Sequence, residues 1–438
     1  MRTKNGSVFA VCDPIEILDA LVGLKDVRVL RYVRDGADVE LVVEQVLNEP
    51  RCPDCGGVAR VKDRPVARYV DLAVYGRPMR LCWRKHRLAC RNPECPKKSW
   101  VSADHRIAAV SCLLTTRAAK WATRQVGGGR TVKEVAEELG CNWHTVNQAV
   151  TVYGRALLGA DKNRLNRTVA IGLDETSFTR QQGHAQTCYV TTVADVQNHQ
   201  IIDLLPNRKY EDVAKYLKAQ PEAWKERIQY GALDMSNTYA AVYSVTLPKA
   251  AQVVDPYHVV SLANRALDEV RRRVQREQHG HRGRRDDPLY RARRLLLTGQ
   301  EKLTDKTESK RATLLALGDP DGEVAIAYLT KERIRDFYRT SNKDDARTML
   351  SEIIAICGHP SRPAEIKKLG RTLNKWFEKI CNYHQARITN APAEGLNNLI
   401  KRVKRVGYGF RNFENYRIRV LLYAGKPNWR TLGSIIVQ

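Results

Sequence analysis

The order of strand-like and helix-like segments between residues 168 and 254 constrains the fold of this chain more than any other feature. Three runs rich in apolar and β-branched residues follow one another with no helical pattern between them, which predicts an antiparallel meander. Two helical segments then alternate with two further strands. The expected strands are 168–173, 188–193, 200–205, 228–233 and 250–254, and the expected helices are 210–218 and 237–247. This β-β-β-α-β-α-β order predicts a mixed sheet with helices on its faces.

A long helical stretch follows the last of these strands and runs for more than a hundred residues. The preceding strand and helix order is the opening of a ribonuclease-H-like fold, and a helix near residue 394 returns to it. The helical stretch is therefore interpreted as an insertion within the sheet domain. Because 438 residues is about three times the usual length of one domain, further domains are expected before the sheet.

The net charge limits the kind of partner that this chain binds. Lys and Arg number 74 against 48 Asp and Glu, which leaves a net charge of +26 and a pI near 9.7. Nucleic acid is the expected partner, because a basic surface that neutralises phosphates gains affinity by releasing counterions. No apolar run approaches the roughly 20 residues that span a bilayer, and the first residues do not read as a signal peptide. We expect a cytosolic protein without a membrane partner.

Four of the 11 cysteines form two pairs that flank a strand-rich segment. These are Cys52, Cys55, Cys90 and Cys95. Two turns that each present two thiolates are typical of a zinc ribbon, which holds one structural Zn²⁺ through four sulfur ligands. Because the second pair has four intervening residues instead of the usual two, Cys82 and His86 stay open as alternative ligands.

A helix-turn-helix pattern occupies residues 131–150. Thr131 and Glu134 predict a capping box at the start of the first helix, and Gly140 predicts a left-handed turn at its end. Polar residues at the start of the second helix would point outwards, where side chains can reach base edges in a major groove. The predicted DNA contacts are Asn142, His144, Thr145 and Gln148.

Three acidic residues stand where the predicted fold brings separate elements together. Asp174 ends the first strand, Asp234 ends the fourth, and Glu394 lies on the returning helix. Because the first and fourth strands are expected to be neighbours, the two aspartates would project side by side with the glutamate across them. Such a triad can hold two divalent ions for in-line phosphoryl transfer, and its hard oxygen ligands select Mg²⁺ or Mn²⁺. Glu175 would face the opposite side of its strand and is a weaker candidate.

Asp255 is the alternative to Asp234 as the second ligand, since it also ends a strand. We favour Asp234 because its strand is expected beside the first one, whereas the strand that ends at Asp255 should lie further out. His258, one helical turn later, is a possible auxiliary residue that orients the scissile phosphate. An ordinary hydrogen-bonded histidine is an equal interpretation of it.

Together these segments resemble the DDE transposases of the ISL3 group of bacterial insertion sequences. The resemblance rests on the cysteine pairs, the helix-turn-helix and the segments 172–178, 234–236, 255–260, 263–265, 271–273, 390–401 and 407–413. It implies that Asp174, Asp234 and Glu394 are the catalytic triad. It also implies that double-stranded DNA is the partner, as terminal inverted repeats and as target. Synapsis of two DNA ends implies a homodimer or larger oligomer, in the bacterial cytoplasm at the nucleoid.

The segment around and after the glutamate has the composition of a DNA-binding face. Residues 371–411 contain 9 Lys and Arg but only 2 Asp and Glu. The predicted phosphate contacts are Lys401, Arg402, Lys404, Arg405 and Arg411. Three interleaved aromatic residues are candidates for stacking on unpaired bases: Trp376, Tyr408 and Phe410.

We therefore expect a multidomain α/β enzyme, with a ribonuclease-H-like core that is interrupted by an all-α insertion and preceded by a zinc ribbon and a helix-turn-helix. The expected parts are an N-terminal segment 1–44, a zinc ribbon 45–110, a helix-turn-helix domain 111–160, a catalytic core 161–258 and 388–438, and an insertion 259–387. The resemblance implies metal-dependent cleavage and joining of DNA. The alternatives are a non-catalytic zinc-ribbon and helix-turn-helix regulator, or a structure-specific nuclease of the same fold.

Overall fold

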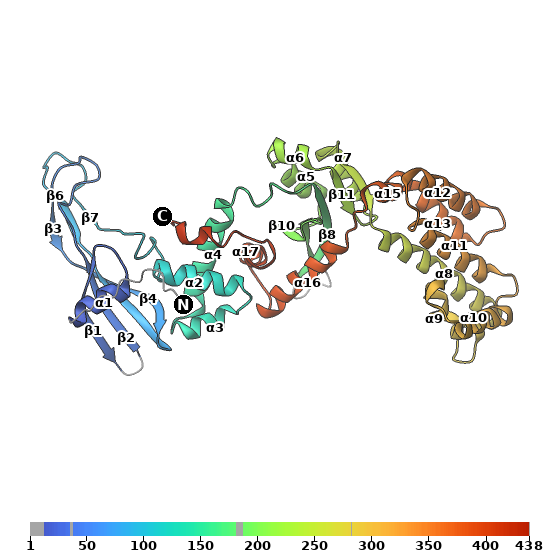
Figure 1. The fold of residues 1–438 in the computed structure, drawn as a ribbon, viewed down its shortest axis with the longest axis horizontal. Coiled ribbons are helices and arrows are strands. Elements are labelled where there is room, and N and C mark those ends of the chain that lie inside the picture. The colour runs from blue at the N-terminus through green and yellow to red at the C-terminus, as the bar shows by residue number, and fades with distance from the viewer. Residues whose placement is uncertain (1–12, 36–37, 181–186, 282, 438) are drawn as a thin grey trace, which may run out of the picture. The chain divides into compact units, whose positions relative to one another are not determined.

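The computed structural model describes residues 13–35, 38–180, 187–281 and 283–437 (Figure 1). The chain divides into two compact units. The central unit is Leu165–Asn398, and the terminal unit joins Met1–Arg164 with Leu399–Gln438. None of the helices in the described ranges is long and apolar enough to cross a membrane.

A five-stranded mixed sheet forms one part of the central unit, in the order β10-β9-β8-β11-β12 (Figure 1). Its strands are β8 (Ala170–Arg180), β9 (Thr187–Asp195), β10 (Gln200–Leu205), β11 (Tyr230–Leu233) and β12 (Ala251–Val254). The first three strands pair antiparallel, whereas β11 runs parallel to both β8 and β12. The antiparallel meander and the neighbouring positions of the first and fourth strands are both confirmed.

The helices of this sheet domain are α5 (Tyr210–Lys218), α6 (Glu222–Arg227) and α7 (Asn237–Thr246). Sequence analysis predicted α5 and α7 but not the six-residue α6. One face of the sheet, with Ile171 and Leu173, packs with α5 and α7 in a continuous apolar core. Tyr243 anchors α7 there, because its hydroxyl donates to the backbone carbonyls of Ile171 and Ala232.

The described residues between the last strand and the returning helix form helices joined by short turns and contain no strand, as predicted for an all-α insertion. Its helices are α8 (Pro256–His279), α9 (Pro288–Leu297), η1 (Gln300–Lys302), α10 (Asp305–Gly318), α11 (Glu323–Phe337), α12 (Lys343–Gly358), α13 (Ala364–Lys375), α14 (Phe377–Cys381) and α15 (Tyr383–Ala386). Pro256 and the Asp255 side chain begin α8 directly after β12. The helical segment therefore continues from the sheet without a linker.

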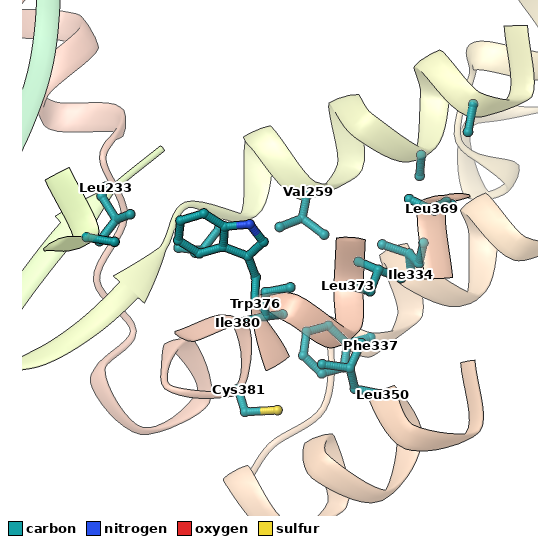
Figure 2. Close-up of a cluster of buried hydrophobic side chains, with 14 of the residues drawn as sticks. Leu233, Val259, Ile334, Phe337, Leu350, Leu369, Leu373, Trp376, Ile380 and Cys381 are labelled. Carbon is teal, nitrogen blue, oxygen red and sulfur yellow. The ribbon is translucent and has the colours of Figure 1, made fainter. Parts of the chain in front are cut away.

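The core of the helical segment is continuous with the core of the sheet. Figure 2 shows the indole of Trp376 between Leu233 and Val259, with Ile380 close to it. Trp376 is only 5% exposed, so the prediction that it stacks on unpaired bases is wrong. An indole that is buried among aliphatic side chains serves packing and cannot reach DNA.

Two separate sheets form the N-terminal part of the terminal unit. After α1 (Pro14–Val22), the four strands of order β1-β2-β5-β4 are β1 (Val27–Asp35), β2 (Asp38–Gln45), β5 (Arg77–Arg84) and β4 (Val66–Val74). The smaller sheet consists of β3 (Ala59–Asp63), β6 (Arg87–Cys90) and β7 (Ser99–Val101). Because β2 pairs parallel with β5, the predicted boundary at residue 44 cuts through one sheet. The strand-rich segment between the cysteine pairs contains an antiparallel pair, β4 and β5, which belongs to the larger sheet.

Three helices follow and carry the helix-turn-helix: α2 (Thr116–Gly127), α3 (Val132–Glu138) and α4 (Trp143–Ala160). The capping box of Thr131 and Glu134 is confirmed, and Gly140 has the expected positive φ of +62°. Val135, Val146 and Val150 are buried between the helices.

The C-terminal elements are α16 (Ala391–Val406), α17 (Phe413–Ala424) and η2 (Thr431–Ser434). Residues 399–438 group with the N-terminal part of the chain, whereas sequence analysis had placed them with the catalytic core. The physical reason is apolar packing: Ile418 and Leu422 of α17 share a core with α2 and α4. A Cβ at Gly154 of α4 would lie 2.8 Å from Ile418, so only glycine permits this approach.

Candidate active site and nucleic-acid interface

The two predicted catalytic aspartates lie at neighbouring positions in the sheet. Leu173 of β8 pairs with Leu233 of β11 in a parallel register, so Asp174 and Asp234 are the next residues along adjacent strands. Leu173 and Leu233 are fully buried and fix this register, because a shift would move them out of the core. The structure thus brings together two acids that are 60 positions apart in sequence.

The helix that carries Glu394 approaches β8 closely at Gly172. A Cβ at Gly172 would lie 2.5 Å from Oδ1 of Asn390 and 3.7 Å from the Cβ of Ala393. A side chain at this position would push the start of α16 away from the strand. Glu394 lies in the first turn of α16 and is exposed to solvent. Gly172 therefore sets the distance between the glutamate and the aspartates, a role that sequence analysis did not recognise.

Asn397 connects the helix of Glu394 to Asp174, and sequence analysis missed this residue as well. Its side-chain amide donates a 2.7 Å hydrogen bond to Oδ2 of Asp174. Its amide oxygen accepts hydrogen bonds from the hydroxyls of Thr176 (2.6 Å) and Thr192 (3.1 Å). Asn397 is 6% exposed. The signal was present in the sequence, since Asn397 lies one helical turn after Glu394 and therefore on the same face of the helix.

The electrostatics of the site raise the pKa of both aspartates. Burial raises the pKa of Asp174 to about 6, even though the backbone N–H of Glu175 donates to it, and the negative charges of Asp234 and Glu394 add to the rise. Burial also raises the pKa of Asp234, against the opposing effect of nearby His258. Carboxylates that are desolvated beside one another are stable as anions only with a positive partner.

Asp255 and His258 have different environments. Asp255 follows β12, is 3% exposed and accepts hydrogen bonds from the backbone N–H groups of Tyr257 and Asn390. Its carboxylate thereby caps α8 and ties down the chain just before α16. His258 is half-buried and close enough to Asp174 and Asp234 to lower the pKa of both. Glu175 forms an ion pair with Arg208 at 2.7 Å.

The three carboxylates offer a suitable donor set for a divalent cation. Oδ1 of Asp234 is buried and accepts no hydrogen bond from any described residue, which is unfavourable unless a cation or proton binds there. Hard oxygen donors prefer Mg²⁺ or Mn²⁺. The triad does not form a closed ligand cluster: within the described ranges, the four cysteines are the only group of three or more metal-binding side chains whose ligand atoms lie within 4.8 Å of one another.

The four cysteine thiols converge at one end of the small sheet. The Sγ atoms of Cys52 and Cys95 are 3.7 Å apart, and those of Cys55 and Cys90 are 3.5 Å apart. Four thiolates around a tetrahedral Zn²⁺ with bonds of about 2.3 Å would be about 3.8 Å apart, whereas a disulfide needs about 2.05 Å. The arrangement therefore matches the dimensions of a zinc site.

The longer spacing between Cys90 and Cys95 does not exclude either thiol from this cluster. The two alternative ligands lie elsewhere. Cys82 is buried in β5, and Nε2 of His86 is hydrogen-bonded to Glu44 at 2.8 Å. A four-cysteine site could thus bind zinc without a substitute ligand.

The helix-turn-helix surface differs in part from its prediction. Asn142 is exposed, but its side chain caps α4 by accepting hydrogen bonds from the backbone N–H and the hydroxyl of Thr145. Thr145 is 6% exposed, so the prediction that it points outwards is wrong, because it lies on the face of α4 that carries the buried Val146 and Ala149. His144 and Gln148 are exposed as predicted, and Gln148 donates to the carbonyl of Ser111.

The predicted basic contacts lie mainly on the exposed face of α16. Lys401, Arg402 and Arg405 are exposed, whereas Ile400 and Val403 are buried. Arg411 is exposed in the turn before α17. Lys404 is half-buried, and desolvation lowers its pKa. The amphipathic helix thus presents several cations to solvent.

Of the two remaining aromatic candidates, Tyr408 is 96% exposed. Phe410 is half-buried, and its ring centre lies 5.0 Å from that of Tyr416. These positions leave Tyr408 as the candidate that is open to stacking.

Comparisons with known proteins agree with this arrangement. A family described as "Transposase", the DDE domain of the ISL3 group, matches residues 171–420, more than half of the chain. The helix-turn-helix domain of transposase family ISL3 matches residues 112–153. The chain is similar to the transposase for insertion sequence element IS1001 of Bordetella parapertussis, with 26% identity over 84% of this chain and 87% of that protein. It is also similar to the transposase for IS1557 of Mycobacterium tuberculosis, with 26% identity over 64% of this chain and 65% of that protein.

Proposed function

The chain belongs to the ISL3 family of transposases, and from this premise we propose that it binds the terminal inverted repeats of its own mobile element. In this proposal it cuts the DNA at both ends and joins the exposed 3′-hydroxyls to target DNA. The neighbouring positions of Asp174 and Asp234, with Asn397 of the Glu394 helix bound to Asp174, are the observation that carries this proposal. The strand order β10-β9-β8-β11-β12 supports a ribonuclease-H-like catalytic core.

Asp174, Asp234 and Glu394 are the residues that would hold Mg²⁺ or Mn²⁺. When bound, such ions supply positive charge that activates the attacking oxygen and stabilises the leaving oxygen of the phosphodiester. The protein's own contribution is placement. The register of β8 and β11 holds the two aspartates, Gly172 lets the helix of the glutamate approach them, and Asn397 fixes one oxygen of Asp174.

The roles of the other residues follow from their contacts. Asp255 is proposed as a structural cap rather than a metal ligand, because both of its oxygens accept backbone hydrogen bonds. His258 is proposed as a positive or hydrogen-bonding group near the scissile phosphate. Glu175 is excluded from the proposed site, because its carboxylate pairs with Arg208.

DNA recognition is assigned to the terminal unit. We propose base contacts from the exposed His144 and Gln148 on α4 and phosphate contacts from the basic face of α16 together with Arg411. Asn142 would act mainly as the cap that orients α4. The four-cysteine site is proposed to hold a structural Zn²⁺. Because two DNA ends must be processed together, we expect a homodimer or larger oligomer at the bacterial nucleoid.

A cleavage assay tests this function. Purified protein with Mg²⁺ or Mn²⁺ is incubated with a plasmid that carries the gene and its native flanking DNA, and the product ends are mapped to the nucleotide. We expect cuts at both flanks that leave 3′-hydroxyls at the borders of an inverted repeat, and joining of those ends to a second plasmid. Tight binding of the flanks without cleavage would favour the regulator, and cleavage without joining would favour the nuclease.

A further inference from the structure

A groove in the terminal unit combines exposed aromatic rings with a buried arginine. It has a volume of about 710 Å³ and lies between the start of α3, the start of α4 and the turn that follows α16. Trp143, the first residue of α4, is 42% exposed, and Tyr408 in the turn is 96% exposed. Both line the groove, together with Arg419 of α17. A volume of this size is in the range of sites that hold small organic groups.

Arg419 is buried and has no counter-ion among the residues that the structure describes. The residue is 6% exposed, and its guanidinium forms neither a hydrogen bond nor an ion pair with any residue in the described ranges. Its guanidinium carbon lies 5.0 Å from the ring centre of Phe410. Burial lowers the pKa of Arg419 to about 10, and no acidic neighbour opposes the shift. A buried cation of this kind is costly unless an anion binds it.

A second arginine lies close to Arg419. Arg402 and Arg419 both line a small cavity beside the groove, and no acidic residue is among the described residues that line it. Two guanidinium groups at one cavity repel each other unless an anion lies between them. Planar guanidinium groups match the oxygens of a phosphate well.

Tyr408 holds its ring in solvent at an energetic cost. Its φ of +51° lies in the left-handed region, which is unfavourable for a residue with a side chain, and helix ends usually place glycine there. Gly409, the next residue, also has a positive φ of +94°. A strained, fully exposed aromatic residue beside a groove is typical of a contact site rather than of packing.

We propose that this groove takes one unpaired nucleotide of the DNA, with its phosphate on Arg402 and Arg419 and its base against the rings of Tyr408 and Trp143. Every nucleobase offers a π-face for such stacking, so the site would be tolerant of sequence. The proposal rests on the proposed DNA-processing function and adds to it a site for single-stranded DNA.

The acidic residues that line the groove are already engaged. Glu134 accepts the backbone hydrogen bond of Thr131 in the capping box, at 2.9 Å. Glu137 lies 3.7 Å from Lys133. Arg419 therefore remains the charge available to a ligand.

Binding measurements with the full-length protein test the proposal. The probes are a fluorescent single-stranded dT8 and a blunt duplex of the native flanking DNA. Arg419→Met keeps an unbranched apolar stem but removes the guanidinium and its charge. Arg430→Met removes the charge of an exposed arginine of the same unit that does not line the groove. We expect Arg419→Met to weaken dT8 binding at least tenfold and to leave the melting temperature unchanged or higher. Arg430→Met should change the affinity for dT8 by less than about twofold. The affinity for the duplex should also change by less than about twofold in Arg419→Met.

Equal dT8 affinities for Arg419→Met and Arg430→Met would overturn the proposal. If Arg419→Met unfolds, Tyr408→Gly serves as the test variant for dT8 binding. Glycine keeps the left-handed backbone and removes only the side chain. A loss of dT8 affinity of at least fivefold with an unchanged melting temperature supports the site, and retained affinity refutes it. Failure of the wild-type protein to bind the flanking duplex would count against the proposed function instead, independently of dT8.

Discussion

The cysteine cluster and the carboxylate triad are both proposed metal sites, yet the structure presents them differently. The four thiols already converge, with Sγ atoms 3.5 and 3.7 Å apart in two pairs. The carboxylates share one region of the sheet but do not form a closed cluster among the described residues. Thiols can be neutral and pack together, whereas desolvated carboxylates repel one another. The thiol site therefore needs only two turns and the small sheet between them, whereas the carboxylate site depends on β8, β11 and α16, which are far apart in the sequence.

The largest effect is expected at the cysteines. The double substitution of Cys52 and Cys55 by Ser should release about one Zn²⁺ per chain and unfold the small sheet, because structural zinc contributes about 10–16 kcal/mol of apparent binding free energy. Metal analysis and circular dichroism measure both effects. Cys82→Ser is the matched control, since Cys82 lies outside the cluster. A wild-type protein without bound metal would refute the zinc site.

Loss of one carboxylate should remove catalysis without unfolding the protein. Asp234→Asn is expected to keep duplex binding and to lower the cleavage rate by about 10³-fold or more. The loss of a group that stabilises the transition state electrostatically has an effect of this size. Glu175→Gln is the control, because Glu175 is the acid next to Asp174 but pairs with Arg208. If Glu175→Gln abolished cleavage and Asp234→Asn did not, the proposed triad would be incorrect.

The raised pKa of Asp174 predicts a dependence of stability on pH. The folded protein holds this proton more tightly, so its contribution to stability is complete below the unfolded pKa of 3.8 and is lost as pH rises through about 6. The loss amounts to at most about 3 kcal/mol of unfolding free energy. Denaturant titrations of zinc-loaded protein without Mg²⁺ or Mn²⁺ should show it between pH 4.5 and 7.

Two comparisons make this measurement specific. Asp174→Asn, which cannot ionise, should lose less stability than wild type over the same pH range. Addition of Mn²⁺ should restore stability at pH 7 in the wild type alone. Parallel curves for the two proteins would show that Asp174 does not titrate in this way.

The smallest effect is expected at the residue that supports the triad. Asn397→Ala should lower the cleavage rate by about 10–100-fold, because partners that orient a metal ligand typically contribute that much. The affinity of Asn397→Ala for Mn²⁺, measured by calorimetry without DNA, should also be weaker than that of the wild type. The control is Asn398→Ala at the exposed neighbouring residue, which should leave the cleavage rate and the Mn²⁺ affinity unchanged. A decrease in melting temperature with normal Mn²⁺ affinity would reduce Asn397 to a packing role.

Much of the fold followed from the sequence because it depends on neighbours along the chain. The apolar and β-branched runs of β9 and β10, the capping box of Thr131 and Glu134 and the turn at Gly140 all involve groups a few residues apart. The order of strands then left few ways to assemble the sheet. The resemblance to the ISL3 transposases and the expectation that the chain binds DNA could also be predicted, because motifs and net charge are read from the sequence without coordinates.

Long-range packing decided the features that the sequence left open or predicted wrongly. Trp376 was assigned to DNA by its basic neighbours, but the apolar surfaces of α8 and α14 bury it. Thr145 was assigned to the exterior as one of the polar residues at the start of α4, but it lies on the same face of the helix as the buried Val146 and Ala149. Residues 399–438 were assigned to the catalytic core, but Ile418 and Leu422 pack against the helix-turn-helix.

The sequence by itself determined the types of elements, the acids and thiols available for chemistry and the basic character of the partner surface. Only the tertiary structure decided which polar groups meet: Asn397 lies on Asp174, backbone N–H groups lie on Asp255, and no acidic side chain in the described part of the chain pairs with Arg419. Element type depends on interactions within a few residues, which a local pattern records. The partner of a buried polar group depends on which distant surfaces come together, and no local pattern carries that information.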